Sequence, residues 1–225
     1  MSLTSAGKQP GGSDECGAYA LQCVLQSLDG QRATSIQGVK RLDPANVPSG
    51  YTVAVGRGEK EELHDLFYQA SGVLELELEE QRARYAYAGS GMNAPSALAT
   101  IAAQAGYRVR EVVISSACKA TYKELSVSNS GCRNLYTTEK ALLTRIGVAV
   151  REREGFDPPP DGSLSLVLVR DGEHWVAVSG EELYDPATGG VEEWSRVADH
   201  PTDLTTTTDM TYDCTGLRIT VALPS

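Results

Sequence analysis

Histidine is scarce in this chain, and its cysteines are few and irregularly spaced. The 225 residues include three histidines, His64, His174 and His200, and five cysteines at positions 16, 23, 118, 132 and 214. The cysteines form no CxxC pair, which argues against a zinc cluster, and a chain of this length does not depend on a disulfide framework. We therefore expect free thiols in a reducing compartment, no bound metal, and very few candidates for a catalytic base.

The sequence also lacks the patterns of membrane, nucleic-acid-binding and nucleotide-binding proteins. No apolar run approaches the length of a transmembrane helix, and the N-terminal MSLTSAGKQ lacks the hydrophobic stretch of a signal peptide. Basic residues do not cluster, and a net charge of −10 argues against a nucleic-acid partner. No GxxxxGKS/T or GxGxxG motif opens a helix after a strand. We expect a cytoplasmic protein without a cofactor, with secretion as an effector left open.

The composition does supply enough apolar material for one folded domain. Hydrophobic residues make up 41% of the chain, which is sufficient for a full core at this length. The proline-rich FDPPPDG at 156–162 cannot continue a helix or a central strand, so it marks the most plausible internal boundary. We expect a single domain over 1–225, with a helical part at about 10–155 and a strand-rich part at about 163–223.

A cysteine near the N-terminus lies where a glycine-rich loop turns into a predicted helix. Ser13 or Asp14 is expected to cap this helix, which places Cys16 in its first turn. The apolar side chains that recur at three- and four-residue spacing are Ala18, Leu21, Val24, Leu25 and Leu28. The free N–H groups and the helix dipole favour a thiolate at this place, and the thiolate is the nucleophile. The alternative is a small buried hydrophobe, which is how we interpret Cys23.

The remaining helical part shows mixed periodicities, which predict an α+β fold. The expected helices cover residues 60–70, 93–106 and 138–147, and the expected strands cover 51–55, 73–79, 107–114 and 148–150. Residues 73–79, with the EEQRARYAYA that follows, also suit a helix. The segments 29–58, apart from its short strand, and 118–133 are predicted to be loops. Asn93 is expected to cap the helix at 93–106, and Gly106 is expected to end it. His64 is interpreted as a solvated helix histidine.

The strand-rich part brings a histidine and an acid toward each other. Residues 164–170 and 174–178 alternate around the hairpin signal Asp171-Gly172, a short strand ends at Asp185, and 217–223 closes the sheet. In antiparallel neighbours, a residue early in one strand faces a residue late in the next, so His174 and Asp185 should meet. An acid so placed orients the imidazole while its other nitrogen takes a thiol proton. Taken singly, His174 could be a half-exposed strand residue and Asp185 an ordinary turn residue.

These residues resemble those of a papain-like cysteine peptidase. The similarity to double-glycine-leader (bacteriocin-processing) peptidases rests on Gln9 with ECGAYAL, on ALATIAAQAGYRV, and on HWVAV followed by LYDPATGG. Josephin-type deubiquitinases are similar in Gln9, Cys16, the LQ of the first helix and EHWVAV. The resemblance implies an α+β papain-like fold, in which a helical part with the cysteine helix packs on a C-terminal antiparallel sheet with the histidine and the acid.

The resemblance also implies a role for each site residue. Cys16 would be the nucleophile, His174 the general base and then acid, Asp185 the orienting group and Gln9 the oxyanion donor. Gln9 precedes Cys16 by seven positions, so the intervening loop must curl for the amide to reach. Josephin domains carry Asn at the third position, unlike Asp185.

The expected activity is hydrolysis of a peptide, isopeptide or amide bond in a protein or peptide substrate, through a Cys16 thioester. A transglutaminase-like or deamidating acyltransferase would use the same residues, and a papain-like fold can also serve as a non-catalytic binding module. The sequence does not identify the substrate, because loops form the walls of such a cleft.

Overall fold

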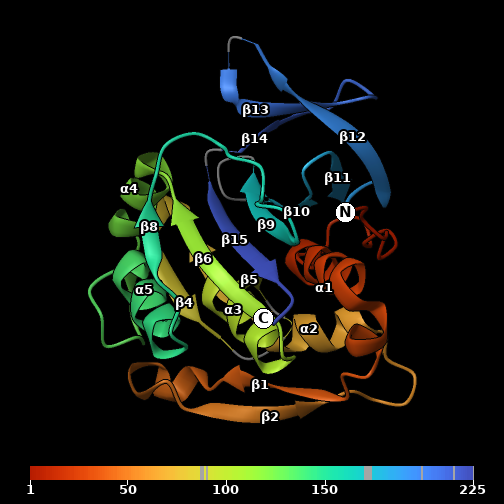
Figure 1. The fold of residues 1–225 in the computed structure, drawn as a ribbon. Coiled ribbons are helices and arrows are strands. Elements are labelled where there is room, and N and C mark those ends of the chain that lie inside the picture. Colours follow the sequence, from red (N-terminus) through yellow and green to blue (C-terminus); the bar gives the residue numbers. More distant parts are fainter. Residues whose placement is uncertain (87–88, 90, 170–173, 199, 215, 225) are drawn as a thin grey trace.

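The computed structural model describes residues 1–225 except 87–88, 90, 170–173, 199, 215 and 225 (Figure 1). The described chain is a mixed α+β protein, as the periodicities predict. Its helices are α1 (Cys16–Thr34), α2 (Leu63–Ser71), α3 (Pro95–Gln104), α4 (Ser116–Glu124) and α5 (Leu135–Arg145), with 3-10 turns η1 (Pro44–Ser49) and η2 (Leu78–Glu80). None of the helices in these described stretches combines the length and the apolar character that crossing a bilayer requires.

A nine-stranded sheet forms the centre of the molecule, in the order β14-β13-β12-β11-β10-β9-β15-β6-β8. Its strands are β6 (Arg108–Ile114), β8 (Val150–Glu152), β9 (Ser163–Val169), β10 (His174–Val178), β11 (Glu182–Asp185), β12 (Gly190–Val197), β13 (His200–Thr206), β14 (Thr211–Asp213) and β15 (Leu217–Ala222). Neighbouring strands are antiparallel except β6 and β8, which run parallel. These two strands precede the proline-rich segment, so the sheet includes both parts of the chain.

The central strands are buried on both faces, because alternate side chains enter two different cores. Leu166 and Leu168 of β9 join the larger core with α1, whereas Val167 and Val169 join a smaller core on the opposite face. Helices α1 and α3 lie against the first face, and β12, β13 and β14 extend the sheet at the edge far from β8 (Figure 1).

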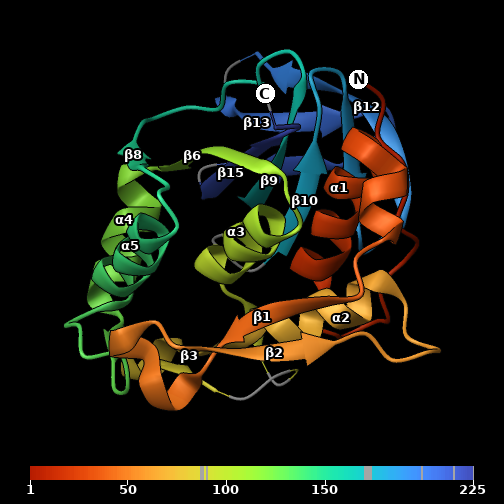
Figure 2. The same ribbon diagram turned by 60° about the horizontal axis from the view of Figure 1, so that its bottom comes forward.

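Two smaller sheets complete the fold. β1 (Gly38–Leu42) and β2 (Thr52–Gly56) form an antiparallel ribbon that lies against α2 and α3 (Figure 2). The other sheet has the order β5-β3-β4-β7, and its strands are β3 (Gly72–Glu77), β4 (Arg82–Tyr85), β5 (Met92–Asn93) and β7 (Ser126–Val127). The strand predicted over 51–55 is therefore confirmed as β2, but the prediction of loop for the preceding segment missed β1.

The predicted loop over 118–133 is also partly wrong, because α4 occupies its beginning. Ser115 Oγ accepts a 3.1 Å hydrogen bond from the Cys118 N–H and caps this helix. Tyr122 is its only fully buried side chain, so the segment carries almost no apolar periodicity for a sequence argument to detect.

The predicted caps of α1 and α3 are wrong, since tertiary contacts replace them. Glu15 occupies the N-cap position of α1 without a side-chain cap, so neither Ser13 nor Asp14 caps it. The first turn of α3 is capped from another helix: the Glu139 carboxylate accepts from the Ser96 N–H at 2.6 Å and from Ser96 Oγ at 3.0 Å. Glu139 is buried, and this burial raises its pKa although the hydrogen bonds oppose the rise.

The other predicted elements are present with shifted ends. Residues 60–70, 73–79 and 107–114 correspond to α2, β3 and β6, and the terminal strand corresponds to β15. Gly106 follows α3 with a φ of +82°, a backbone conformation that favours glycine, so the predicted terminator is confirmed. The Asp171-Gly172 turn lies outside the described residues.

Candidate active site

Cys16 is the first residue of α1, and its main chain lies at the open end of the helix. The Ala18 and Tyr19 N–H groups both donate to the Glu15 carbonyl, at 2.9 and 3.1 Å. The Gly17 N–H donates to Asn93 Oδ1 at 2.9 Å. Within the described part of the chain, the Cys16 N–H makes no hydrogen bond. It is therefore an available donor beside the sulfur.

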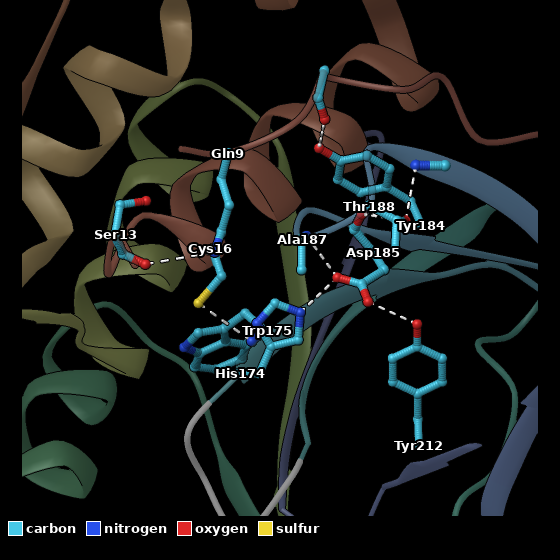
Figure 3. Close-up of polar contacts among 12 residues, drawn as sticks. Gln9, Ser13, Cys16, His174, Trp175, Tyr184, Asp185, Ala187, Thr188 and Tyr212 are labelled. Atoms are coloured by element: carbon cyan, nitrogen blue, oxygen red, sulfur yellow. Dashed lines mark hydrogen bonds and ion pairs between the residues drawn. The ribbon is translucent and has the colours of Figure 1, made fainter. Parts of the chain in front are cut away.

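The Cys16 sulfur contacts the first residues of β10. Its Sγ accepts a hydrogen bond from the main-chain N–H of Trp175 at 3.5 Å, and the His174 ring lies beside it (Figure 3). Cys16 is only 6% exposed and His174 only 8% exposed, so little water competes for these contacts. A donor aimed at sulfur stabilises a negative charge on it.

His174 lies between the sulfur and an acid, as the order of the strands predicts. Its Nε2 is 2.7 Å from Asp185 Oδ1, and Figure 3 shows the ring between the Cys16 sulfur and the Asp185 carboxylate. β10 and β11 are antiparallel, with Ala177 opposite Tyr184, which brings the end of β11 back to the start of β10. Because Nε2 is engaged by Asp185, Nδ1 is the nitrogen left for the sulfur.

The surroundings of His174 and Asp185 favour the charged form of each side chain. Burial lowers the pKa of His174, but the hydrogen bond to Asp185 and the interactions with the neighbouring Cys16 and Asp185 outweigh it and raise this pKa to about 9. Burial likewise raises the pKa of Asp185, yet the hydrogen bonds from His174 and Tyr212 dominate and lower it overall. The imidazole is therefore protonated at neutral pH beside an ionised carboxylate.

Described residues donate three hydrogen bonds to the Asp185 carboxylate. Besides His174, its Oδ1 accepts from the Ala187 N–H at 2.7 Å, and its Oδ2 accepts from the Tyr212 hydroxyl at 2.7 Å. Asp185 is 2% exposed, and a carboxylate so deeply buried needs such donors to stay ionised. No sequence pattern predicted β14 or a role for Tyr212, because this strand is only three residues long.

Gln9 lies in the loop that precedes Cys16, and its side chain extends toward Cys16 (Figure 3). Its Nε2 donates to the Ser13 carbonyl at a long 3.5 Å, and its Oε1 is buried without a partner among the described residues. Its main-chain N–H donates to the Pro186 carbonyl at 2.9 Å. The structure thus joins His174 and Asp185 by a hydrogen bond, and it places the Cys16 sulfur and Gln9 beside them.

The N-terminal segment, residues 1–9, carries Gln9 along β11 and the turn that follows it. The Leu3 N–H donates to Glu182 Oε2 at 2.6 Å, and the Tyr184 hydroxyl donates to the Gly7 carbonyl at 2.6 Å. Leu3 is buried in the larger core. These contacts attach the segment to the strand that ends at Asp185.

Asn93 has a different role from the predicted helix cap. Besides accepting from Gly17, it donates from Nδ2 to Ser71 Oγ at 2.7 Å. The approach is close: a Cβ added to Gly17 would lie 2.6 Å from the Cβ of Asn93. Asn93 therefore connects the start of the cysteine helix to the end of α2.

His64 is not the solvated residue that its helical position suggests. Its ring stacks on Tyr19 with a centroid distance of 3.9 Å, and its Nδ1 lies 3.2 Å from Gln22 Oε1. Burial lowers its pKa, although the nearby charge of Asp65 opposes this. Packing against α1, which a single-helix pattern does not reveal, explains the difference.

The other cysteines differ from Cys16 in their surroundings. Burial raises the pKa of Cys23 to about 12 in spite of hydrogen bonds that oppose it, and burial alone raises that of Cys118 to about 12. Burial also raises the pKa of Cys214. The cysteines of the described chain are free thiols, and no group of three or more His, Cys, Asp or Glu side chains there could hold a metal ion.

Comparison of the chain with protein-family models, with curated proteins and with solved structures gives no match.

Proposed function

We propose that this protein is a papain-like cysteine hydrolase that cleaves a peptide, isopeptide or amide bond. The observation that carries the proposal is the placement of the His174 ring between the Cys16 sulfur and the Asp185 carboxylate, with 2.7 Å between His174 Nε2 and Asp185 Oδ1 (Figure 3). A nucleophile, a base within hydrogen-bond reach and a group that orients the base are the parts that acyl transfer requires.

In the proposed first step, the Cys16 thiolate attacks the carbonyl carbon, and the carbonyl electron pair moves to its oxygen. The Cys16 N–H and the Gln9 side-chain amide donate to this oxyanion, each contributing about 3 kcal/mol. His174 transfers its Nδ1 proton to the leaving nitrogen, the C–N bond breaks, and a thioester remains on Cys16. Asp185 holds Nε2 throughout, which keeps Nδ1 directed at the sulfur.

In the second step, neutral His174 removes a proton from water, and the resulting hydroxide attacks the thioester carbonyl. The C–S bond then breaks, the acid product leaves, and the thiolate and the protonated imidazole return. An amine in place of water would give transamidation with the same residues. A protein or peptide substrate fits this chemistry, and hydrolysis is the simplest outcome because water is the most abundant acceptor.

Selective alkylation tests the nucleophile without knowledge of the substrate. We expect iodoacetamide at about pH 6 to modify Cys16 ahead of the other cysteines, because a paired thiolate reacts where protonated thiols do not. Peptide mapping by mass spectrometry identifies the site, and Cys23→Ala, a change in the same helix, serves as the control that keeps the labelling. Labelling that does not select Cys16 over Cys23, Cys118, Cys132 and Cys214 contradicts the proposal.

Activity tests distinguish the proposed reaction from its alternatives. Incubation of the protein with a peptide library and a primary amine, followed by mass measurement, separates cleavage from amine incorporation and from deamidation. We expect cleavage that Cys16→Ala abolishes. A Cys16→Ala variant with full function in its host would instead indicate a binding module.

A further inference from the structure

We propose that Tyr212 is a positioning residue of this site, acting on His174 and Cys16 through Asp185. The inference rests on the proposed function for its catalytic meaning. This gives β14 a role in the site. It also gives a role to the three-stranded extension β12–β14, because Cys16, His174 and Asp185 all lie outside it.

The two carboxylate oxygens of Asp185 accept hydrogen bonds from different donors. Oδ1 is shared by His174 Nε2 and the Ala187 N–H, and the Ala187 contact is local to the turn that Asp185 opens. Among the described residues, Tyr212 supplies the hydrogen bond to Oδ2, at 2.7 Å. It fixes the second oxygen and so the plane of the carboxylate, which keeps Oδ1 aligned with the imidazole.

The Tyr212 ring is anchored by its own packing. Tyr212 is 2% exposed and lies opposite Leu204 in the β13–β14 pair. It packs in the smaller core with Phe156 and Val178. The ring is therefore held by apolar contacts, independently of its hydroxyl. Phenylalanine at this position would keep those apolar contacts and remove the hydroxyl that donates to Asp185.

Tyr212 also stabilises the negative charge of the Asp185 carboxylate. In the part of the chain that the structure describes, the titratable groups that face Asp185 are His174 from β10, Tyr212 from β14 and Tyr184 from its own strand, with Cys16 of α1 acting through His174. His174 is the cation of this group, and Tyr212 is the neutral donor. Loss of the Tyr212 hydroxyl thus leaves a buried carboxylate with one hydrogen bond fewer, and Asp185 should take up a proton at higher pH.

The test follows the His174 ring by NMR over a pH titration, without any substrate. The ring signal should show an acid-side inflection from Asp185, which Asp185→Asn removes and so identifies. In Tyr212→Phe we expect this inflection to move up by about one pH unit, the size of one charge-assisted hydrogen bond. The acid limb of Cys16 alkylation should move in the same direction.

Tyr107→Phe is the matched control. Tyr107 is 3% exposed, and its hydroxyl donates to the main-chain carbonyls of Leu25 and Asp29, away from the site. This variant should lose stability without moving the inflection. In an Asp185→Asn background, Tyr212→Phe should have no further effect on the alkylation profile.

An inflection at the wild-type pH in Tyr212→Phe overturns the inference, as does an equal alkylation shift in the Asp185→Asn background. Because the NMR titration needs no catalysis, it tests Tyr212 even if the chain cleaves no peptide, so failure of the proposed function is seen separately in the cleavage assay.

Discussion

The main-chain N–H of Gln9 donates a 2.9 Å hydrogen bond to the carbonyl oxygen of Pro186, the residue that follows Asp185. The N-terminal segment that carries the proposed oxyanion donor is thereby attached to the turn that carries the orienting acid. Gln9 and Pro186 are 177 positions apart in the sequence, so only the folded sheet brings them together.

Gln9→Ala should lower the rate of acylation about 100-fold with little change in KM, because an oxyanion donor acts mainly in the transition state. Steady-state kinetics on a cleaved peptide measures both constants. Gln69→Ala is the control, since Gln69 Nε2 bonds to Glu61 Oε1 at 3.0 Å, away from the site. A rise in KM alone would assign Gln9 to substrate binding instead.

Gly17→Ala should impair the site, whereas Gly30→Ala in the same helix should not. A Cβ at Gly17 would lie 2.6 Å from the Cβ of Asn93, while a Cβ at Gly30 has nothing within 4 Å. The clash must displace α1 beside Cys16 or push Asn93 away. Melting temperature and Cys16 alkylation rate should both fall for Gly17→Ala only. Equal behaviour of the two variants would contradict this placement of Asn93.

Asn93→Ala should destabilise the fold by about 1–3 kcal/mol, because it leaves the Gly17 N–H without its acceptor and Ser71 without its donor. Urea unfolding measures the loss. Asn46→Ala serves for comparison: this exposed side chain bonds only to Asp43 Oδ2 among the described residues, and its loss should cost less than about 0.5 kcal/mol. A similar small effect at both positions would show that Asn93 is not an anchor.

Because His174 pairs with Asp185, the free energy of unfolding should fall as the pH becomes alkaline. Its folded pKa, about 9, lies above the ordinary value of 6.5. The folded state therefore binds the proton more tightly, so this stabilisation is complete below about pH 6.5 and disappears as the pH rises through about 9. Over that range the free energy of unfolding should fall by an amount on the order of 3 kcal/mol.

Urea unfolding of the wild type and of His174→Gln across this pH range isolates the contribution of His174. The variant should show a flatter profile, and the two curves should approach each other at the alkaline end. Parallel curves would mean that His174 is not held as a cation in the folded protein.

Much of this site follows from local sequence. Cys16 precedes an apolar helical repeat, and the alternation around His174 and the short connection to Asp185 predict antiparallel neighbours. These are short-range patterns, and the structure contains both: Cys16 is the first residue of α1, and His174 meets Asp185 at 2.7 Å. The start of the helix and the pairing of the strands are thus determined by the sequence itself.

Contacts between distant segments could not be predicted from any periodicity. The three-dimensional fold alone decides that Glu139 caps α3, that Asn93 binds Gly17 and that Tyr212 donates to Asp185. The physical reason is that a hydrogen bond between segments depends on the relative placement of helices and strands, and that placement is set by how the two cores fill. Local residue order determines which side chains can do chemistry here, and the packing of the two faces of one sheet determines which of them meet.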